Sequence, residues 1–330
     1  MVFFVLSGYL VGGSVITAWR RHGRLDTWGY AVAPLSRMWT VLIPTLVLTF
    51  VADRIGWSLL GGTALIPGGP DRTLGLDRFH VQCRFLQTVA CDYYGSNLPL
   101  WSLAIEFWYY VALPFLAFAL LSRGAPGLRV LAVLVAVGLL ALLTTLQFYG
   151  AAIGPYFLIW LLGTAAAAGV FPLLVKNPLW SAGALLLYAC AARLGLRYEM
   201  LEASPLLSFA NDLVLCLLFT HLLVAMRGWS RLPAAPAAKL HQHLAGFSFS
   251  LYAIHWPILS LIVAGSLSAF GLGWRMRLGR PGEWLVFTAI LALVIISGWL
   301  FSLLREAHTP KLRRAAMTRL TPKAGAAAPL

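Results

Sequence analysis

Charged side chains are scarce in this chain. Only 11% of its 330 residues are Asp, Glu, Lys or Arg, whereas 60% are hydrophobic, and soluble domains carry about 25% charged residues. The length alone would suit two soluble domains, but this composition argues against them. Acidic residues are the scarcest, with 11 against 25 Lys and Arg, which leaves a net charge of +14. Since the positive charges lie in short segments between apolar runs, no nucleic-acid partner is predicted.

Cysteine is also rare, with four residues in the chain. No spacing is that of a zinc site or a c-type haem site, so we predict no metal site and no bound cofactor. Cys190 and Cys216 lie in apolar runs, where we expect them to pack as small hydrophobic residues. Cys83 and Cys91 share one segment and are compatible with a disulfide or with two free thiols.

Motifs of the common soluble enzymes are missing as well. The chain has no Walker loop, no HExxH and no GxSxG on a strand-to-helix turn. Chemistry of those classes is therefore not expected here.

Long apolar runs dominate instead. A membrane-spanning helix needs about 20 apolar residues, and irregular backbone cannot face lipid. Nine runs qualify, at roughly 2–18, 38–54, 99–121, 128–147, 151–170, 179–195, 205–226, 246–269 and 283–304. We therefore predict an all-α fold, a polytopic membrane helix bundle with about nine transmembrane helices. We expect a membrane-embedded domain over 1–306 and a basic, disordered cytoplasmic tail over 307–330.

The distribution of Lys and Arg predicts the orientation. Most of these residues lie in one alternate set of segments, at 19–37, 122–129, 171–178, 227–243 and 305–330. This set should face the cytoplasm, with the C-terminus inside a cell inner or plasma membrane and the long segment 53–98 outside. The first helix would then start outside with no signal peptide before it. We therefore expect one more helix upstream of Met1 in the natural protein, with a true nine-helix protein as the alternative.

A carboxylate lies inside one predicted span. Ser102, Glu106, Tyr109 and Leu113 follow at helical spacing and share one face. An acidic group at the centre of a membrane helix costs roughly 2.5–3.5 kcal/mol, so the stripe should face the bundle interior. One interpretation is a structural Glu paired with an Arg of another helix. The other is a carboxylate that orients a catalytic base or holds substrate.

A second polar stripe occurs in the eighth predicted span. Ser248, Tyr252, His255 and Leu259 share a face, and Pro257 should kink the helix just past His255. At about 1.5 Å per residue, Glu106 and His255 would lie at similar depths near the midplane. We predict that both line one cavity, with helices that face away from each other as the alternative.

Two further residues are candidates for binding. Arg37 lies at the start of the second predicted span, where an Arg either anchors the helix by snorkelling or binds the phosphates of a donor with its planar fork. Ser7 lies beside Gly8 and Gly12, a small-residue pair that should pack closely against another helix.

These motifs together resemble the acyltransferase 3 family of integral-membrane O-acyltransferases. The matching residues are Phe3-Phe-Val-Leu-Ser-Gly-Tyr9, Arg37 with Pro44, Trp101-Ser-Leu with Glu106 and Tyr109, Ser250-Leu-Tyr-Ala-Ile-His-Trp-Pro257, and Glu306. They occur in order over nearly the whole chain. The resemblance implies a ten-helix bundle whose first helix carries an Arg and a catalytic His. Neither has a counterpart in this sequence, and we expect the upstream helix to supply them.

The resemblance also implies an activity. Such proteins transfer an acyl group, usually acetyl, from a cytoplasmic thioester to a hydroxyl of a glycan, glycolipid or other glycosylated acceptor. We therefore expect O-acetylation of a polysaccharide or similar carbohydrate by a protein in contact with membrane lipid, with acyl-CoA, first of all acetyl-CoA, as donor substrate. The alternatives are a transporter or flippase of a glycan or lipid and a catalytically inactive family remnant.

The candidate catalytic residues are Glu106 and His255. We expect Glu106 to orient or charge the family's His, or to bind the acceptor, and His255 to shape the cavity rather than replace that His. The candidate residues for substrate and donor binding are Arg37, Ser7, Ser102, Tyr109, Tyr252 and Ser248.

Overall fold

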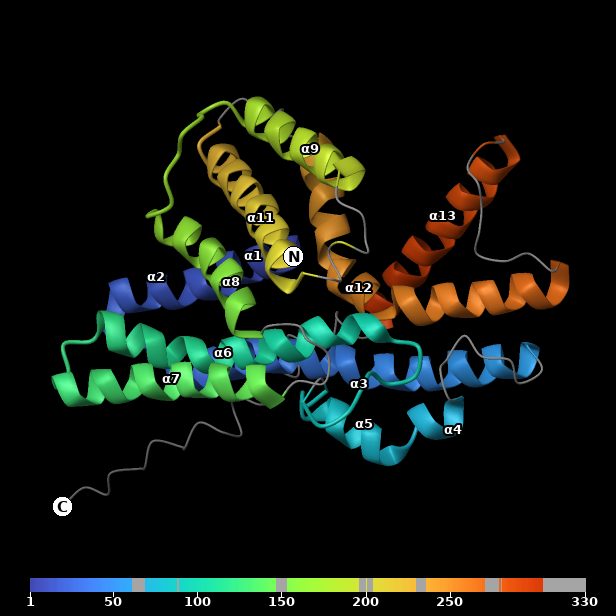
Figure 1. Cartoon of the computed structure of the whole chain (residues 1–330), viewed down its shortest axis with the longest axis horizontal. Helices are drawn as coiled ribbons and strands as arrows, with labels where there is room; N and C mark the ends of the chain where they lie inside the picture. Colours follow the sequence, from blue (N-terminus) through green and yellow to red (C-terminus); the bar gives the residue numbers. More distant parts are fainter. Residues whose placement is uncertain are drawn as a thin grey trace, which may run out of the picture. The chain divides into compact units, whose positions relative to one another are not determined.

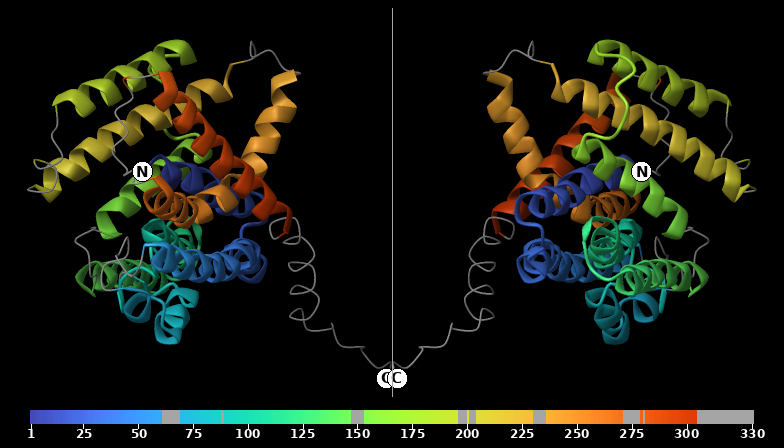
Figure 2. Two further views of the ribbon diagram at one scale, coloured as in Figure 1. Left: turned by 90° about the vertical axis from the view of Figure 1, so that its right-hand side faces the viewer. Right: turned by 90° about the vertical axis from the view of Figure 1, so that its left-hand side faces the viewer.

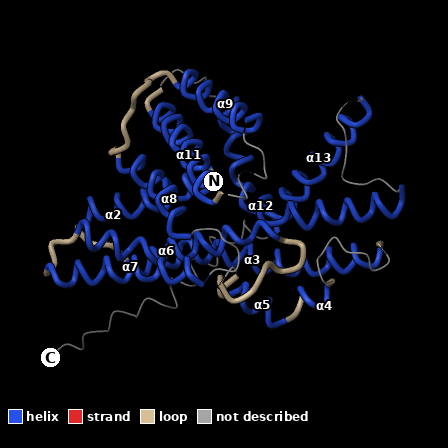
Figure 3. The backbone as a smooth tube through the Cα atoms, in the orientation of Figure 1, coloured by secondary structure: helices blue, strands red, loops and turns tan. Residues whose placement is uncertain are grey.

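A computed structural model describes residues 1–60, 69–87, 89–146, 153–195, 200, 204–229, 236–270, 279 and 281–304. Within these ranges the regular elements are helices joined by loops (Figure 3). They are α1 (Val2–Ser7), η1 (Gly8–Gly12), α2 (Gly13–His22), α3 (Thr27–Leu59), α4 (Pro70–Thr73), α5 (Leu76–Cys83), η2 (Leu98–Leu100), α6 (Trp101–Leu121), α7 (Pro126–Leu146), α8 (Ile153–Ala168), α9 (Pro178–Gly195), α11 (Pro205–Arg227), α12 (Pro236–Phe270) and α13 (Pro281–Leu304). The predicted all-α class is confirmed.

Seven described helical runs are long and apolar enough to cross a membrane, which confirms a polytopic membrane helix bundle. The other two predicted spans are helices as well. Helix α8 is apolar but has only 16 residues, and α9 has 18 residues with Arg193 in its last turn. The predicted tail at 307–330 and Glu306 lie outside the described residues.

The chain divides into two compact units. The first contains Met1–Tyr30 and Ile105–Ala234, and the second contains Ala31–Ala104 and Ala235–Leu330. Helices α3 and α6 each contribute residues to both units. Each unit is therefore described by itself.

The first unit is built around a close contact between η1 and α8. A Cβ atom added at Gly8 would overlap the carbonyl oxygen of Trp160, and one added at Gly163 would overlap that of Val5. The Thr164 hydroxyl donates to the Gly8 carbonyl oxygen at 3.1 Å. Two backbones can approach this closely only where both helices present small residues. The predicted packing role of the Gly8 and Gly12 pair is confirmed.

Aromatic rings fill the space beside this contact. Tyr109 lies 5.0 Å from Phe157, 5.8 Å from Phe4 and 6.1 Å from Trp160, measured between ring centroids. Phe157 and Trp160 are stacked at 5.7 Å. Tyr109 and Trp160 are completely buried. Rings at these distances attract each other beyond the effect of burial alone, so this cluster anchors α1, α6 and α8.

In the second unit, the segment that follows α3 folds back along it. Trp39 donates its indole N–H to the Cys83 carbonyl oxygen at 2.9 Å, and the Ser96 backbone N–H donates to Asp53 at 2.7 Å. Trp39 and Asp53 are about 21 Å apart along the helix at 1.5 Å per residue. The predicted long external segment over 53–98 is corrected at its start, because its first seven residues complete α3. Helices α4 and α5 follow within this segment.

Helix α12 carries Pro257 in its interior. Figure 1 shows a pronounced bend between its two halves, in keeping with the hydrogen bond that a proline removes. Helix α13 meets α12 in both views of Figure 2. The contact is tight because a Cβ atom at Gly298 would lie 2.8 Å from Leu251 Cδ1.

The four cysteines are free thiols, so Cys83 and Cys91 adopt the second of the two predicted states. Cys216 is buried as predicted, but Cys190 is exposed on α9. The prediction for Cys190 was wrong because a lipid-facing helix surface is as apolar as a core, and sequence alone does not separate the two.

Candidate functional site

Glu106 is buried in the second turn of α6, with 2% of its surface exposed. The Tyr110 hydroxyl donates to Glu106 Oε1 at 2.7 Å. The two residues are four apart, the spacing that brings side chains together on one helix face. A hydroxyl bound to a carboxylate forms one of the stronger hydrogen bonds found in proteins. Glu106 therefore accepts a strong hydrogen bond in a place that has little access to water.

A relay of hydrogen bonds leads to this carboxylate. The Trp160 indole N–H donates to Ser7 Oγ at 3.1 Å, and Ser7 Oγ lies 3.1 Å from the Tyr110 hydroxyl. An indole N–H can only donate, and the Tyr110 hydroxyl donates its one proton to Glu106. Ser7 must therefore donate to Tyr110. Every proton in the relay therefore points towards Glu106.

The relay joins residues from three helices. Ser7 comes from α1, Glu106 and Tyr110 from α6, and Trp160 from α8. The Tyr30 hydroxyl also donates to the Tyr110 backbone carbonyl oxygen at 2.9 Å. Sequence analysis named Ser7 and Glu106 but missed their link, Tyr110, although its spacing from Glu106 was a usable signal. Tyr109, which it named instead, contributes its ring to the aromatic cluster.

A second carboxylate in the first unit also escaped sequence analysis. Asp212 lies on α11 and accepts a hydrogen bond from the Tyr156 hydroxyl at 2.8 Å. Its neighbour Asn211 accepts one from the Tyr188 hydroxyl at 3.2 Å. The Asn-Asp pair inside an apolar span was the available signal, because ionisable groups in membrane helices usually face the protein interior.

In the second unit, the predicted residues Ser102 and Tyr252 meet. Their hydroxyl oxygens are 2.6 Å apart, and Tyr252 also lies 2.8 Å from the Pro99 carbonyl oxygen. Ser102 Oγ lies 3.3 Å from the same carbonyl oxygen, so the two hydroxyl groups and the Pro99 carbonyl form one hydrogen-bonded cluster in which the carbonyl accepts. This pair ties the bent helix α12 to the start of α6.

His255 is half-buried on α12, one turn beyond Tyr252. Its Nδ1 lies 2.6 Å from the Tyr252 carbonyl oxygen. Because that oxygen only accepts, Nδ1 must carry a proton. In the neutral ring the lone pair is then on Nε2, so His255 can accept a proton or a hydrogen bond there.

Arg37 is exposed in the first third of α3. Its guanidinium carbon lies 5.1 Å from the centroid of the Phe249 ring, within the range of a cation–π contact. Ser248, beside Phe249, is exposed and donates to the Ala245 carbonyl oxygen of its own helix at 2.9 Å. The contact with Phe249 holds the Arg37 guanidinium in position.

The structure thus groups the predicted residues in two sets. Ser7 and Glu106 belong to one relay in the first unit, while Ser102, Tyr252 and His255 are linked in the second. Glu106 and His255 fall in different units, so their convergence on one cavity stays a prediction. Among the described residues, no group of three His, Cys, Asp or Glu side chains is placed to hold a metal ion.

Comparison with known protein families places the chain within one of them. The family model of the acyltransferase 3 family, described as an acyltransferase domain, matches residues 1–303. No curated protein and no solved structure matches the chain.

Proposed function

Because this chain belongs to the acyltransferase 3 family, we propose that it transfers an acyl group, first of all acetyl, from a cytoplasmic acyl-CoA to a hydroxyl of a glycan or glycolipid. The observation that carries the proposal is the relay ending at Glu106. The Tyr110 hydroxyl donates to Glu106, and Ser7 and Trp160, from two other helices, orient that hydroxyl. In our proposal this arrangement keeps a negative charge at a fixed position.

Acyl transfer has a definite need for such a charge. The acceptor hydroxyl attacks the thioester carbonyl, a C–O bond forms, the C–S bond breaks, and the hydroxyl proton leaves with a base. The released thiolate then takes up a proton and departs as CoA-SH. A base that accepts the proton becomes positive, and a nearby carboxylate stabilises that positive charge and fixes the orientation of the base. Glu106 fills this role in our proposal.

The donor requires a different kind of site. Coenzyme A carries phosphates, and an Arg guanidinium binds phosphate oxygens in pairs. Arg37 is exposed and is held against Phe249, so we assign it to the donor. His255, with its Nε2 lone pair, and the Ser102–Tyr252 pair are assigned to the cavity in which the acyl group and the acceptor meet.

The test is transfer of radiolabelled acetyl from acetyl-CoA. Membranes from cells that express the protein from its complete coding sequence are incubated with the donor, and label is measured in the polysaccharide, glycolipid and protein fractions. We expect label in a carbohydrate fraction, released by mild alkali as acetate, and little label with Glu106→Gln. Equal labelling by Glu106→Gln at equal protein amount would remove Glu106 from the reaction. Absence of labelled carbohydrate, with uptake or movement of a glycan in its place, would favour a transporter.

A further inference from the structure

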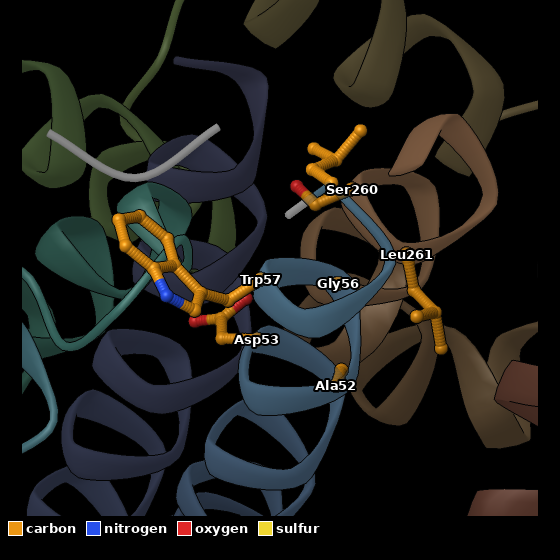
Figure 4. A pocket seen from close by; sticks show the side chains of 7 residues that line it. Ala52, Asp53, Gly56, Trp57, Ser260 and Leu261 are labelled. Carbon is orange, nitrogen blue, oxygen red and sulfur yellow. The ribbon is translucent and has the colours of Figure 1, made fainter. Parts of the chain in front are cut away.

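A small hollow opens between α3 and α12 in the second unit. It is lined by Ala52, Asp53, Gly56, Trp57, Leu60, Ser260 and Leu261 (Figure 4). Its empty space is about 260 Å³ when the open mouth is included, and only a group of about the size of a water molecule fits inside it. The hollow therefore admits the edge of a larger molecule, such as one hydroxyl of a ring.

Two residues on one face of α3 give the hollow its chemistry. Asp53 and Trp57 are four residues apart, so they lie side by side on the helix. The Asp53 carboxylate is only 4% exposed and accepts the Ser96 backbone N–H at 2.7 Å through Oδ2. The Trp57 ring is half-exposed. The hollow thus combines an aromatic face with a carboxylate, and Ser260 adds a hydroxyl from α12.

The backbone near Asp53 is shaped to hold the carboxylate in place. Gly95 has φ +55°, and a Cβ atom there would overlap Asp53 Oδ2. Gly69, with φ +77°, similarly lies against the Trp57 ring, where a Cβ atom would come within 3.0 Å. Only glycine adopts such φ values without strain. Both side chains that face the hollow are therefore fixed by tight turns of the folded-back segment.

The charge of the hollow identifies the class of ligand. None of its seven lining residues is cationic, and one is a carboxylate, so phosphates of an acyl-CoA would be repelled. Hydroxyl groups donate well to a carboxylate, and the C–H face of a sugar ring packs on an aromatic ring as other apolar surfaces do. The ligand that meets both demands is a neutral sugar.

We infer that this hollow binds a sugar ring of the acceptor, with Asp53 accepting a hydroxyl and Trp57 packing on the ring face. The inference rests on the proposed function and deepens it by assigning a place to the acceptor. Asp53 and Trp57 are binding residues here, separate from the relay at Glu106. If the hollow binds the acceptor but not the donor, substitutions in it should change the half-saturating concentration of the acceptor and leave that of the donor unchanged.

The experiment measures acetyl transfer at varied amounts of each substrate. Heat-treated envelope membranes of the source cells supply the acceptor, labelled acetyl-CoA is the donor, and the full-length protein is purified in a detergent without sugar head groups. Asp53→Asn keeps an oxygen for the Ser96 N–H, while Trp57→Leu removes the aromatic face. Ser58→Ala is the matched control, because Ser58 follows Trp57 on α3 but is exposed and donates to the Arg54 carbonyl oxygen of its own helix.

We expect Asp53→Asn to raise the concentration of envelope acceptor that gives half of the maximal rate about tenfold, because one charge-assisted hydrogen bond is lost. Trp57→Leu should raise the same concentration about fivefold. The half-saturating acetyl-CoA concentration should not change, which also shows that the variants fold. Ser58→Ala should match the native protein. An unchanged acceptor requirement in both pocket variants overturns the inference while the proposed function stands. If the native protein labels no carbohydrate, the proposed function fails, and the inference fails with it.

Discussion

Two buried carboxylates, Glu106 in the first unit and Asp53 in the second, are held in different ways. Glu106 accepts a tyrosine hydroxyl at the end of a side-chain relay. Asp53 accepts a backbone N–H from a tight turn and faces a hollow beside a half-exposed Trp. In our proposal the first arrangement serves chemistry in an enclosed place, and the second, at the edge of a hollow, serves binding. Burial alone does not distinguish these roles, but the donors and the open space around each carboxylate do.

The largest expected effect comes from removing the charge at the end of the relay. Glu106→Gln keeps the size of the side chain and an oxygen for Tyr110, so the protein should fold. Loss of a charge that stabilises the reaction should lower the maximal rate about 10²-fold or more, measured by label transfer at saturating donor and acceptor. The control is Asp212→Asn, which changes another tyrosine-bound carboxylate of the same unit and should cost far less. Equal losses of maximal rate in the two variants would show that Glu106 contributes no more to the reaction than Asp212 does.

A smaller effect is expected when the relay is cut one step earlier. Tyr110→Phe removes the hydroxyl that binds Glu106 but keeps the ring, so the maximal rate should fall about tenfold. Tyr188→Phe is the matched control, because the Tyr188 hydroxyl binds the amide of Asn211 and not a carboxylate. If Tyr110→Phe reacts at the native rate, the relay has no part in holding the charge of Glu106.

In the second unit, Gly95→Ala should displace the Asp53 carboxylate and leave the relay of the first unit unchanged. The new methyl group would overlap Asp53 Oδ2 at a φ of +55°, and strain of this kind costs about 1–3 kcal/mol. We expect a lower melting temperature and a several-fold higher acceptor requirement. Gly127→Ala, where nothing lies within 4 Å, serves as control. A native melting temperature for Gly95→Ala would contradict the tight turn described above.

The smallest effect concerns a thiol in the segment that holds Asp53. Burial raises the pKa of the Cys91 thiol, so less thiolate is present at a given pH than in a free cysteine. Since thiolate is the reactive form, the alkylation rate of Cys91 by iodoacetamide should rise to its plateau at a higher pH than that of a cysteine peptide. The rate is followed by mass spectrometry of the Cys91 peptide. A plateau at the peptide's pH would mean that the segment leaves Cys91 open to water.

Several of these features could be predicted because they depend on neighbours in sequence. The stripe of Ser102, Glu106 and Tyr109 is buried as its spacing indicated, and the Gly8–Gly12 pair packs on another helix. Pro257 lies in a helix that bends. Each prediction rests on helical periodicity or on the covalent geometry of one residue.

The features that were missed depend on contacts between distant parts of the chain. Ser7 and Tyr110 are 103 residues apart, so their hydrogen bond exists only once α1 and α6 have packed. Asp53 was treated as the start of an external loop, and its burial follows from the return of Gly95 and Ser96 along α3. No local sequence pattern predicts that Gly95 and Ser96 lie against α3. Asp212 is a different case, because an acidic residue inside an apolar span is itself a local signal for a buried polar site.

The most direct test compares the two carboxylates in one assay. Acetyl transfer is measured over a full range of acceptor concentration for the native protein, Glu106→Gln and Asp53→Asn, at equal amounts of folded protein. The account predicts that Glu106→Gln lowers the maximal rate and leaves the half-saturating acceptor concentration nearly unchanged, and that Asp53→Asn does the reverse. Two variants that change the same parameter to the same extent would contradict the division between a carboxylate for chemistry and a carboxylate for binding.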